Sequence, residues 1–246
     1  MVASCLSRRQ PRNGQRDAAQ LPPEKVARAP MHTDLQLRHL IANYYGMISL
    51  VDHQVGRIRI ALRELGLHQD TLVAYSTDHG EWLGDHGLLL KGPMAYEGLL
   101  RVGLIFEGPG VPASKVVPDP VSTLDLAQTF CDYGQVALHN RVHRRSLRPL
   151  VEAMDTSRDF AYSEWDLRPS RSGVALQLRT VRTRRHKLTM DLISGAGELY
   201  NLQEDPNEME NRFNDVALSA AQGELCDMIA SRSDNACAPL PQVGMA

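Results

Sequence analysis

The residues 76–92, "STDHGEWLGDHGLLLKG", contain two copies of Asp-His-Gly and a lysine among four glycines. In the first copy, Asp78 and His79 offer a carboxylate oxygen and an imidazole nitrogen, which suit a divalent cation such as Ca²⁺, Mn²⁺ or Zn²⁺. Lys91 follows His79 by twelve residues and would bring an ammonium group to an anionic substrate. The same composition is typical of a solvated polar loop, so the segment is either such a loop or half of a metal site.

The other polar residues of this segment leave two interpretations open. The second triplet, Asp85-His86-Gly87, either adds ligands or forms a turn that shapes the loop, and we favour the turn. Glu81 either supports the ligands or is solvated. Gly80 permits a sharp turn, which would let two adjacent residues reach one ion.

Two short apolar runs are expected to position this segment. Residues 71–75 are apolar, partly β-branched and bounded by turn residues, and residues 102–110 have the same form and end in Gly-Pro-Gly. Both runs are typical of buried strands in a parallel sheet. Because functional groups in open parallel sheets collect beyond the carboxyl ends of the strands, Asp78 and His79 are expected at such an edge.

Helices are predicted before and after these strands along the chain. Apolar residues recur at helical spacing from about residue 34 to 65, and Gly66 is expected to end that helix. Residues 121–134 predict a second helix, opened by Ser122 or Thr123 and with Asp125 in its first turn. Strand, loop, strand and helix in this order favour an α/β layered domain.

The pattern changes after about residue 158, where alternating segments predict antiparallel strands. Asp205-Pro206 indicates a turn, and a polar helical tail follows it. We therefore predict a disordered tail or linker over residues 1–30, an α/β domain over 31–157, and a small α+β subdomain with a tail over 158–246.

Composition excludes several classes of protein. With 27 basic and 29 acidic residues the net charge is −2, which argues against nucleic acid or an anionic membrane as the main partner. No apolar run approaches the roughly 20 residues of a membrane span.

The four cysteines show no C-x-x-C spacing, so free thiols in a reducing compartment are expected. The first sixteen residues contain four arginines and no acid but no apolar core of a secretory signal. This segment is interpreted as a disordered tail or as a start site inside a longer coding region, with a transit peptide as the alternative. A cytoplasmic location is expected.

The blocks "YYGMISLVDHQVGRI", "TLVAYSTDHGEWLGDHGLLLKGPMAYEGLLRVGLIFEGPG", "VSTLDLAQTF" and "ELYNLQEDPNEMENR", in this order, closely resemble the sulfatase family. The resemblance runs from about residue 34 to 215. The family belongs to the alkaline-phosphatase-like superfamily and includes arylsulfatases, choline-sulfatase-like enzymes and phosphonate monoester hydrolases. The fold implied is an alkaline-phosphatase-like layered α/β domain with a mostly parallel sheet, followed by the small subdomain of antiparallel strands.

The resemblance assigns roles to three residues. Asp78 and His79 match the second pair of metal ligands of the family, whose second member is Asn or His. Lys91 matches the lysine that contacts the sulfate or phosphate group. The "ELYNLQEDPNE" block matches a carboxyl-terminal signature that is structural. The implied cofactor is a divalent metal, Ca²⁺ or Mn²⁺, and a histidine ligand slightly favours the softer ion.

Two parts of the family's site are missing from this sequence. The nucleophile of such sulfatases is a formylglycine made from the cysteine of C-x-P-S-R, and an acidic pair of metal ligands precedes it. "CLSRR", which begins at Cys5, fits only a looser pattern, has no acidic pair before it, and is interpreted as a chance match. A metal held by Asp78 and His79 alone would be weakly bound and mostly hydrated. A sheet that lacks its first strands would expose an apolar edge, which favours a homo-oligomer or a partner that covers it.

The chain is therefore interpreted as the carboxyl-terminal half of a metal-dependent hydrolase of small sulfate esters, with little or no turnover by itself. One alternative is a phosphate or phosphonate ester hydrolase of the same superfamily. Another, from a different class, is a non-catalytic remnant that binds a partner subunit.

Overall fold

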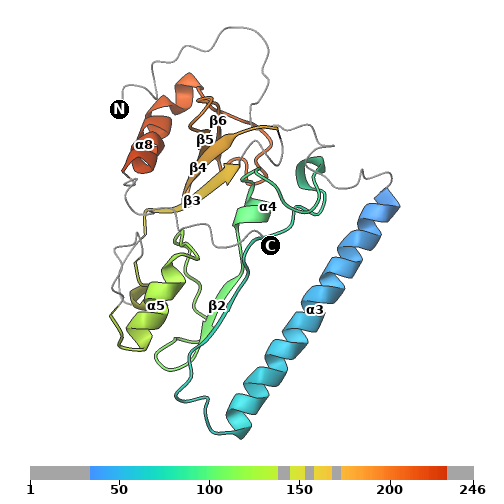
Figure 1. Ribbon diagram of the computed structural model, residues 1–246, viewed down its shortest axis with the longest axis vertical. Helices are drawn as coiled ribbons and strands as arrows, with labels where there is room; N and C mark the ends of the chain where they lie inside the picture. Colours follow the sequence, from blue (N-terminus) through green and yellow to red (C-terminus); the bar gives the residue numbers. More distant parts are fainter. Residues whose placement is uncertain (1–33, 138–144, 153–157, 168–172, 232–246) are drawn as a thin grey trace. The chain divides into compact units, whose positions relative to one another are not determined.

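The computed structural model of the chain describes residues 34–137, 145–152, 158–167 and 173–231 (Figure 1). These residues fall into two compact units, which divide between Lys115 and Val116. The predicted tail over residues 1–30 lies outside the described residues. The predicted boundary between residues 157 and 158 stays a prediction.

The first unit opens with the long helix α3, Asp34–Glu64, which confirms the helix predicted from the apolar spacing. Gly66 ends it, as expected, with a positive φ of 71°. The N–H of Leu67 donates to the carbonyl of Leu62 at 2.8 Å, and the N–H of Gly66 donates to that of Arg63 at 3.0 Å. These two bonds form the Schellman arrangement that satisfies the last carbonyls of a helix.

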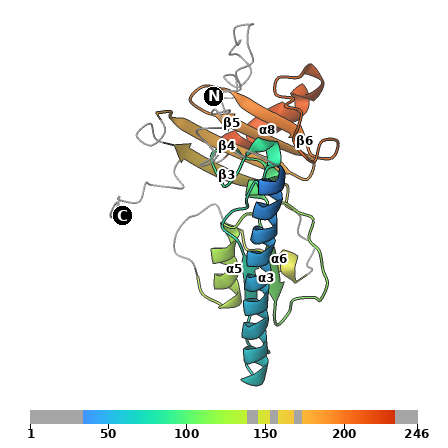
Figure 2. The same ribbon diagram turned by 90° about the vertical axis from the view of Figure 1, so that its right-hand side faces the viewer.

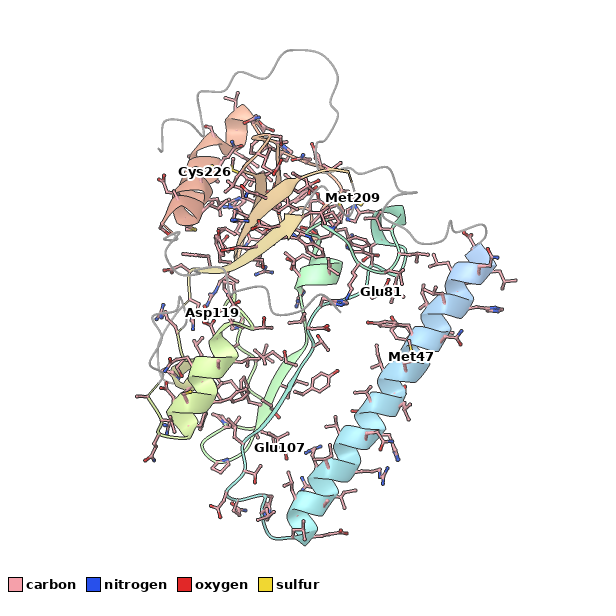
Figure 3. The ribbon with its side chains drawn as sticks, in the orientation of Figure 1. Met47, Glu81, Glu107, Asp119, Met209 and Cys226 are labelled. Carbon is pink, nitrogen blue, oxygen red and sulfur yellow. The ribbon has the colours of Figure 1, made fainter. Side chains whose placement is uncertain are left out.

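α3 contains no buried residue, so its apolar side chains stay partly or largely accessible. The carboxyl-terminal part of α3 forms two ion pairs with β2. Arg59 Nε lies 2.5 Å from Glu107 Oε2, and Arg63 lies 3.7 Å from the same carboxylate. In Figure 3 the labelled Glu107 lies at the end of β2 that is nearer to this part of α3. Exposed ion pairs of this kind contribute little, typically below about 1 kcal/mol each.

The two predicted strands form β1, Val73–Ser76, and β2, Leu104–Glu107, but the predicted parallel pairing is wrong for them. They pair with each other antiparallel, with Val73 opposite Glu107 and Ser76 opposite Leu104. A parallel pair needs a crossover that returns the chain to the same end of the sheet. The connection here contains only short helical turns, among them α4, Glu97–Leu100, and β2 runs back along β1. β2 also alternates between half-buried and exposed positions, as a one-sided strand does.

The second unit contains the predicted antiparallel strands. β3 (Phe160–Leu167), β4 (Leu176–Thr183), β5 (His186–Asp191) and β6 (Gly197–Asn201) form one sheet in sequence order, each antiparallel to the next. The helix α8, Ser219–Ala230, lies along one face of this sheet (Figure 2). Apolar side chains from both elements build the core between them: Val181, Leu188, Met190, Leu199, Leu225 and Cys226.

The "ELYNLQEDPNE" block is part of this sheet and of the loop behind it. Lys187 on β5 pairs with Glu208 of the loop, and both side chains are almost fully buried. Phe213 packs its ring against Gly197, where a Cβ would come within 2.6 Å of the ring. Removing one partner of a buried ion pair typically lowers the free energy of unfolding by about 3–5 kcal/mol. Glu208 therefore has a structural role in this block. Asp215 then accepts from the N–H of Ala217 at 2.8 Å, where the short helix η2, Val216–Leu218, begins.

The predicted helix near Ser122 is α5, Asp125–Tyr133. Asp125 lies in its first turn, is buried, and accepts from the N–H of Ser122 at 3.2 Å and of Arg145 at 3.0 Å. Arg158 Nη1 lies 3.1 Å from the same carboxylate. The acid therefore ties α5 to the segment before the short helix α6, Arg148–Val151, and to the start of β3. Among the described residues, no helix combines the length and the apolar character needed to cross a membrane.

Asp191 at the end of β5 gives the second unit a dependence on pH. Burial raises the pKa of this carboxyl, but hydrogen bonds from the Ser194 hydroxyl and from the backbone N–H groups of Gln177, Ser194 and Ile193 bring the pKa below its ordinary value. A depressed pKa in the folded state stabilises the fold above the ordinary Asp pKa, and this stabilisation is lost as pH falls through the folded-state value.

We expect Asp191→Asn to lower the free energy of unfolding by about 2 kcal/mol at neutral pH, because charge-assisted hydrogen bonds are lost. The variant should also lose part of the wild-type decline in stability below about pH 4. Chemical denaturation between pH 7 and pH 2.5 measures both effects, with the exposed Asp227→Asn as the control. Equal acid sensitivity of Asp191→Asn and wild type would contradict this role.

Candidate metal and anion site

The three residues predicted to carry chemistry lie together just beyond the end of β1. His79 Nε2 is 3.5 Å from Asp78 Oδ2 and 2.7 Å from Lys91 Nζ. Both contacts involve the same ring nitrogen of His79. The structure therefore brings together a carboxylate, an imidazole and an ammonium group that are up to thirteen residues apart in sequence.

The backbone defines which nitrogen of His79 is free for a ligand. Nδ1 lies 2.7 Å from the carbonyl oxygen of Gly80. A carbonyl only accepts, so Nδ1 carries the proton in the neutral ring, and Nε2 keeps its lone pair. Lys91 donates to that lone pair. A carbonyl that accepts from one ring nitrogen, with the lone pair kept on the other, is the arrangement of a metal-binding histidine.

The carboxylate of Asp78 is exposed, as is Lys91, whereas His79 is half-buried. Its Oδ1 accepts from the backbone N–H of His79 at 2.9 Å. This hydrogen bond is the main reason why the pKa of Asp78 lies below its ordinary value, with a smaller contribution from the charge of Lys91. Asp78 is thus ionised at neutral pH, which a carboxylate ligand requires.

Lys91 reaches His79 because the loop between them is closed at its base. Glu81 Oε1 accepts from the backbone N–H of Leu90, and the N–H of Trp82 donates to the carbonyl of Leu90 at 3.3 Å. Trp82 itself is fully buried. Glu81, which is labelled in Figure 3, belongs to the loop that leads along the chain from β1 to α4. The sequence alone left open whether Glu81 supports the ligands or is solvated. Leu90 is nine residues further along the chain, and no local pattern indicates that Glu81 contacts it.

The second Asp-His-Gly triplet forms the turn that was expected. Residues Asp85–Gly87 make a short 3₁₀ turn, with His86 in the left-handed region at a φ of 53°. The His86 ring stacks on Tyr96, with centroids 3.7 Å apart and planes within 6°. Its ring therefore packs within the loop rather than joining Asp78 and His79.

Gly80 serves the site for a different reason from the one predicted. It is absent from the glycines with positive φ, so the turn itself does not demand glycine. Instead, a Cβ on Gly80 would lie 2.0 Å from the carbonyl oxygen of Gly98. The N–H of Gly80 also donates to the carbonyl of Leu99 at 2.8 Å. The segment after β1 and the start of α4 are therefore in direct backbone contact, which only glycine allows.

The donor set fits a divalent cation as a half-site. Asp78 supplies a carboxylate oxygen and His79 supplies the ring nitrogen Nε2, which are ligand types of a divalent cation. Within the described residues, no group of three or more His, Cys, Asp or Glu side chains is arranged to hold a metal ion. Two protein ligands leave most of the coordination shell to water, so weak affinity is expected. Cys5, the chance match to a nucleophile motif, lies outside the described residues.

We expect Glu81→Ala to open the loop at its base, because the N–H of Leu90 loses its acceptor. Amide hydrogen exchange at Leu90 should then accelerate at least about tenfold, the equivalent of one hydrogen bond to a charged group. Glu81→Gln keeps an acceptor oxygen and should exchange nearly as slowly as wild type. Glu64→Ala, an exposed acid on α3, is the control. Unchanged protection of Leu90 in Glu81→Ala would show that the loop closes without this side chain.

Gly80→Ala should destabilise the first unit by about 3 kcal/mol or more, because the new methyl group meets a backbone carbonyl that cannot rotate away. The matched variant Gly46→Ala adds the same methyl group in α3, where nothing lies within 4 Å of it, and should stabilise the helix by up to about 1 kcal/mol. Thermal denaturation of both variants provides the measurement. Similar melting temperatures for the two would refute the close contact.

Comparisons with known proteins place the chain in a family. Two family descriptions match the chain: "Sulfatase" over residues 8–136, and "N-sulphoglucosamine sulphohydrolase, C-terminal" over residues 84–235. An arylsulfatase of Clostridium perfringens is 30% identical over 183 residues, which are 72% of this chain and 37% of the relative. A delta 4,5-hexuronate-2-O-sulfatase of Bacteroides thetaiotaomicron is 29% identical over 205 residues, or 81% of this chain and 42% of the relative.

Among solved structures, the phosphonate monoester hydrolase of Agrobacterium radiobacter superimposes with a TM-score of 0.72 at 31% identity, covering 81% of this chain and 42% of its own. The chain thus spans less than half the length of each of these relatives. The sulfatase description nevertheless covers more than half of the 246 residues. This match shows that the chain belongs to the sulfatase family.

Proposed function

We propose that this chain carries a divalent-metal half-site and the anion-binding lysine of a hydrolase that acts on small sulfate esters. The observation that supports this best is the meeting of Asp78, His79 and Lys91 at the end of β1. Two of these residues supply the ligand types of a divalent cation. The third supplies positive charge beside it, where a sulfate oxygen would carry negative charge.

Each residue has a definite task in this function. Asp78 and His79 would hold the cation, Asp78 as an ionised carboxylate and His79 through Nε2. The bound cation supplies Lewis-acid polarisation of the ester oxygens. Lys91 binds and neutralises a non-bridging oxygen of the anionic group, and charge that grows there in the transition state strengthens this contact. Glu81 holds the loop that carries Lys91. Ca²⁺ and Mn²⁺ both suit the carboxylate, and the imidazole favours Mn²⁺.

A phosphonate or phosphate monoester is the second candidate substrate. The likeness to the phosphonate monoester hydrolase, at 31% identity and a TM-score of 0.72, supports it. Sulfate, phosphate and phosphonate esters all present tetrahedral anionic oxygens to a metal and a lysine. The three described residues therefore suit either class, and the contacts that separate them are expected elsewhere in the intact site.

We further propose that the chain alone has little or no turnover. The sequence contains no C-x-P-S-R motif, so no formylglycine nucleophile is expected from it. Without a nucleophile the covalent route is closed, and two protein ligands hold the cation weakly. What remains for the isolated chain is binding of a metal and an anion, or of a partner subunit that completes the site.

The test combines metal binding with activity. We expect Mn²⁺ to bind the purified chain with a Kd of about 10⁻⁴ to 10⁻³ M, the range of weakly liganded sites, by electron paramagnetic resonance of free Mn²⁺. Asp78→Ala and His79→Ala should abolish this binding, and Asp52→Ala, an exposed acid on α3, should keep it. Binding that survives in Asp78→Ala would contradict the half-site.

Turnover of aryl sulfates and aryl phosphonate esters, with and without Mn²⁺ or Ca²⁺, should stay near the buffer background. Metal-dependent turnover that disappears in Asp78→Ala would confirm the site but overturn the proposal that the chain alone is inactive.

A further inference from the structure

The ring nitrogen of His79 that suits a metal already has a cationic partner. Lys91 Nζ lies 2.7 Å from His79 Nε2, in the position of a donor to its lone pair. The other nitrogen, Nδ1, faces the carbonyl of Gly80 at 2.7 Å and cannot take over as a ligand. An imidazole nitrogen has a single lone pair in the ring plane. Lys91 and a divalent cation therefore cannot both occupy Nε2.

The contact between Lys91 and His79 is held in place by the loop. Leu90, the residue before Lys91, is bound on both sides of its backbone, its N–H by Glu81 and its carbonyl by Trp82. The carboxylate of Asp78 is a second partner of the same ring nitrogen, with Oδ2 at 3.5 Å from Nε2, and the charge of Lys91 acts on this carboxylate as well. A positive charge thus faces both prospective metal ligands.

We propose that Lys91 occupies His79 Nε2 as long as no divalent cation is bound. A divalent cation then displaces Lys91 from this nitrogen and releases its ammonium group to the anionic substrate. The inference rests on the proposed function, because it takes Asp78 and His79 as the ligands. It adds an order of events: the cation binds first, and Lys91 becomes available to the anion as a result.

Two consequences follow from this exchange. Wild-type metal affinity is lowered, because the incoming cation must break a charge-assisted contact and meets a like charge until Lys91 turns away. Metal and anion binding are also coupled positively, because each favours the state in which Lys91 has left His79. Such coupling is reciprocal by thermodynamic necessity.

The experiment is a Mn²⁺ titration of the full chain labelled with ¹⁵N and ¹³C, read as paramagnetic broadening of the His79 ring signals. In Lys91→Met, we expect half-broadening at about tenfold lower free Mn²⁺ than in wild type, the equivalent of one charge-assisted hydrogen bond. Lys115→Met removes the same charge from an exposed lysine and should behave as wild type. Lys91→Gln, which also lacks the charge, should follow Lys91→Met.

Equal or weaker Mn²⁺ binding in Lys91→Met and Lys91→Gln than in wild type would overturn the inference. This failure differs from failure of the proposed function, in which the His79 ring stays sharp in every variant. A second arm adds inorganic sulfate at matched free Mn²⁺. Sulfate should tighten Mn²⁺ binding in wild type and leave it unchanged in Lys91→Met; the same response in both would also overturn the exchange.

Discussion

The hydrogen bond between His79 Nδ1 and the carbonyl of Gly80 determines what the rest of the site can do. It places the proton of the neutral ring on Nδ1 and leaves one lone pair, on Nε2, for a cation. Asp78 Oδ2 and Lys91 Nζ both approach that nitrogen, the first at 3.5 Å and the second at 2.7 Å. The chemistry of the site therefore depends on a backbone carbonyl one residue away from the histidine, and on the close passage of Gly80 past Gly98 that fixes this backbone.

Loop closure is the second requirement, because Lys91 is distant from His79 in sequence. A free loop of this length would spread the ammonium over many positions, and ordering its backbone costs about 1–2 kcal/mol per residue. Burial of Trp82 and the contacts of Glu81 with Leu90 offset this cost. The turn at Asp85–Gly87 reverses the chain, with the His86 ring packed on Tyr96. One histidine of the segment thus contacts Lys91 and Asp78, and the other packs within the loop.

The second unit uses buried charge to hold its connecting segments. Two ion pairs, Lys187 with Glu208 and Arg158 with Asp125, lie at buried positions where apolar side chains are usual. Buried pairs of this kind are poor sources of net stability, but breaking one leaves an uncompensated charge. They therefore specify which segment lies against the sheet and α5. The "ELYNLQEDPNE" block therefore holds a loop against a strand through Glu208 and Lys187.

The sequence by itself determined the long helix that ends at Gly66, the antiparallel strands after residue 158, the turn at Asp85–Gly87 and the family, because these depend on local periodicity, turn chemistry and motif order. It also singled out Asp78, His79 and Lys91. It could not determine that β1 and β2 pair antiparallel, because a short apolar run has the same pattern in a parallel strand as in an antiparallel one. Only the tertiary structure decided that pairing, the role of Glu81 and the contact of Lys91 with His79. Each of these is an encounter between residues far apart along the chain, and a local pattern contains no information about which distant backbone group a side chain will meet.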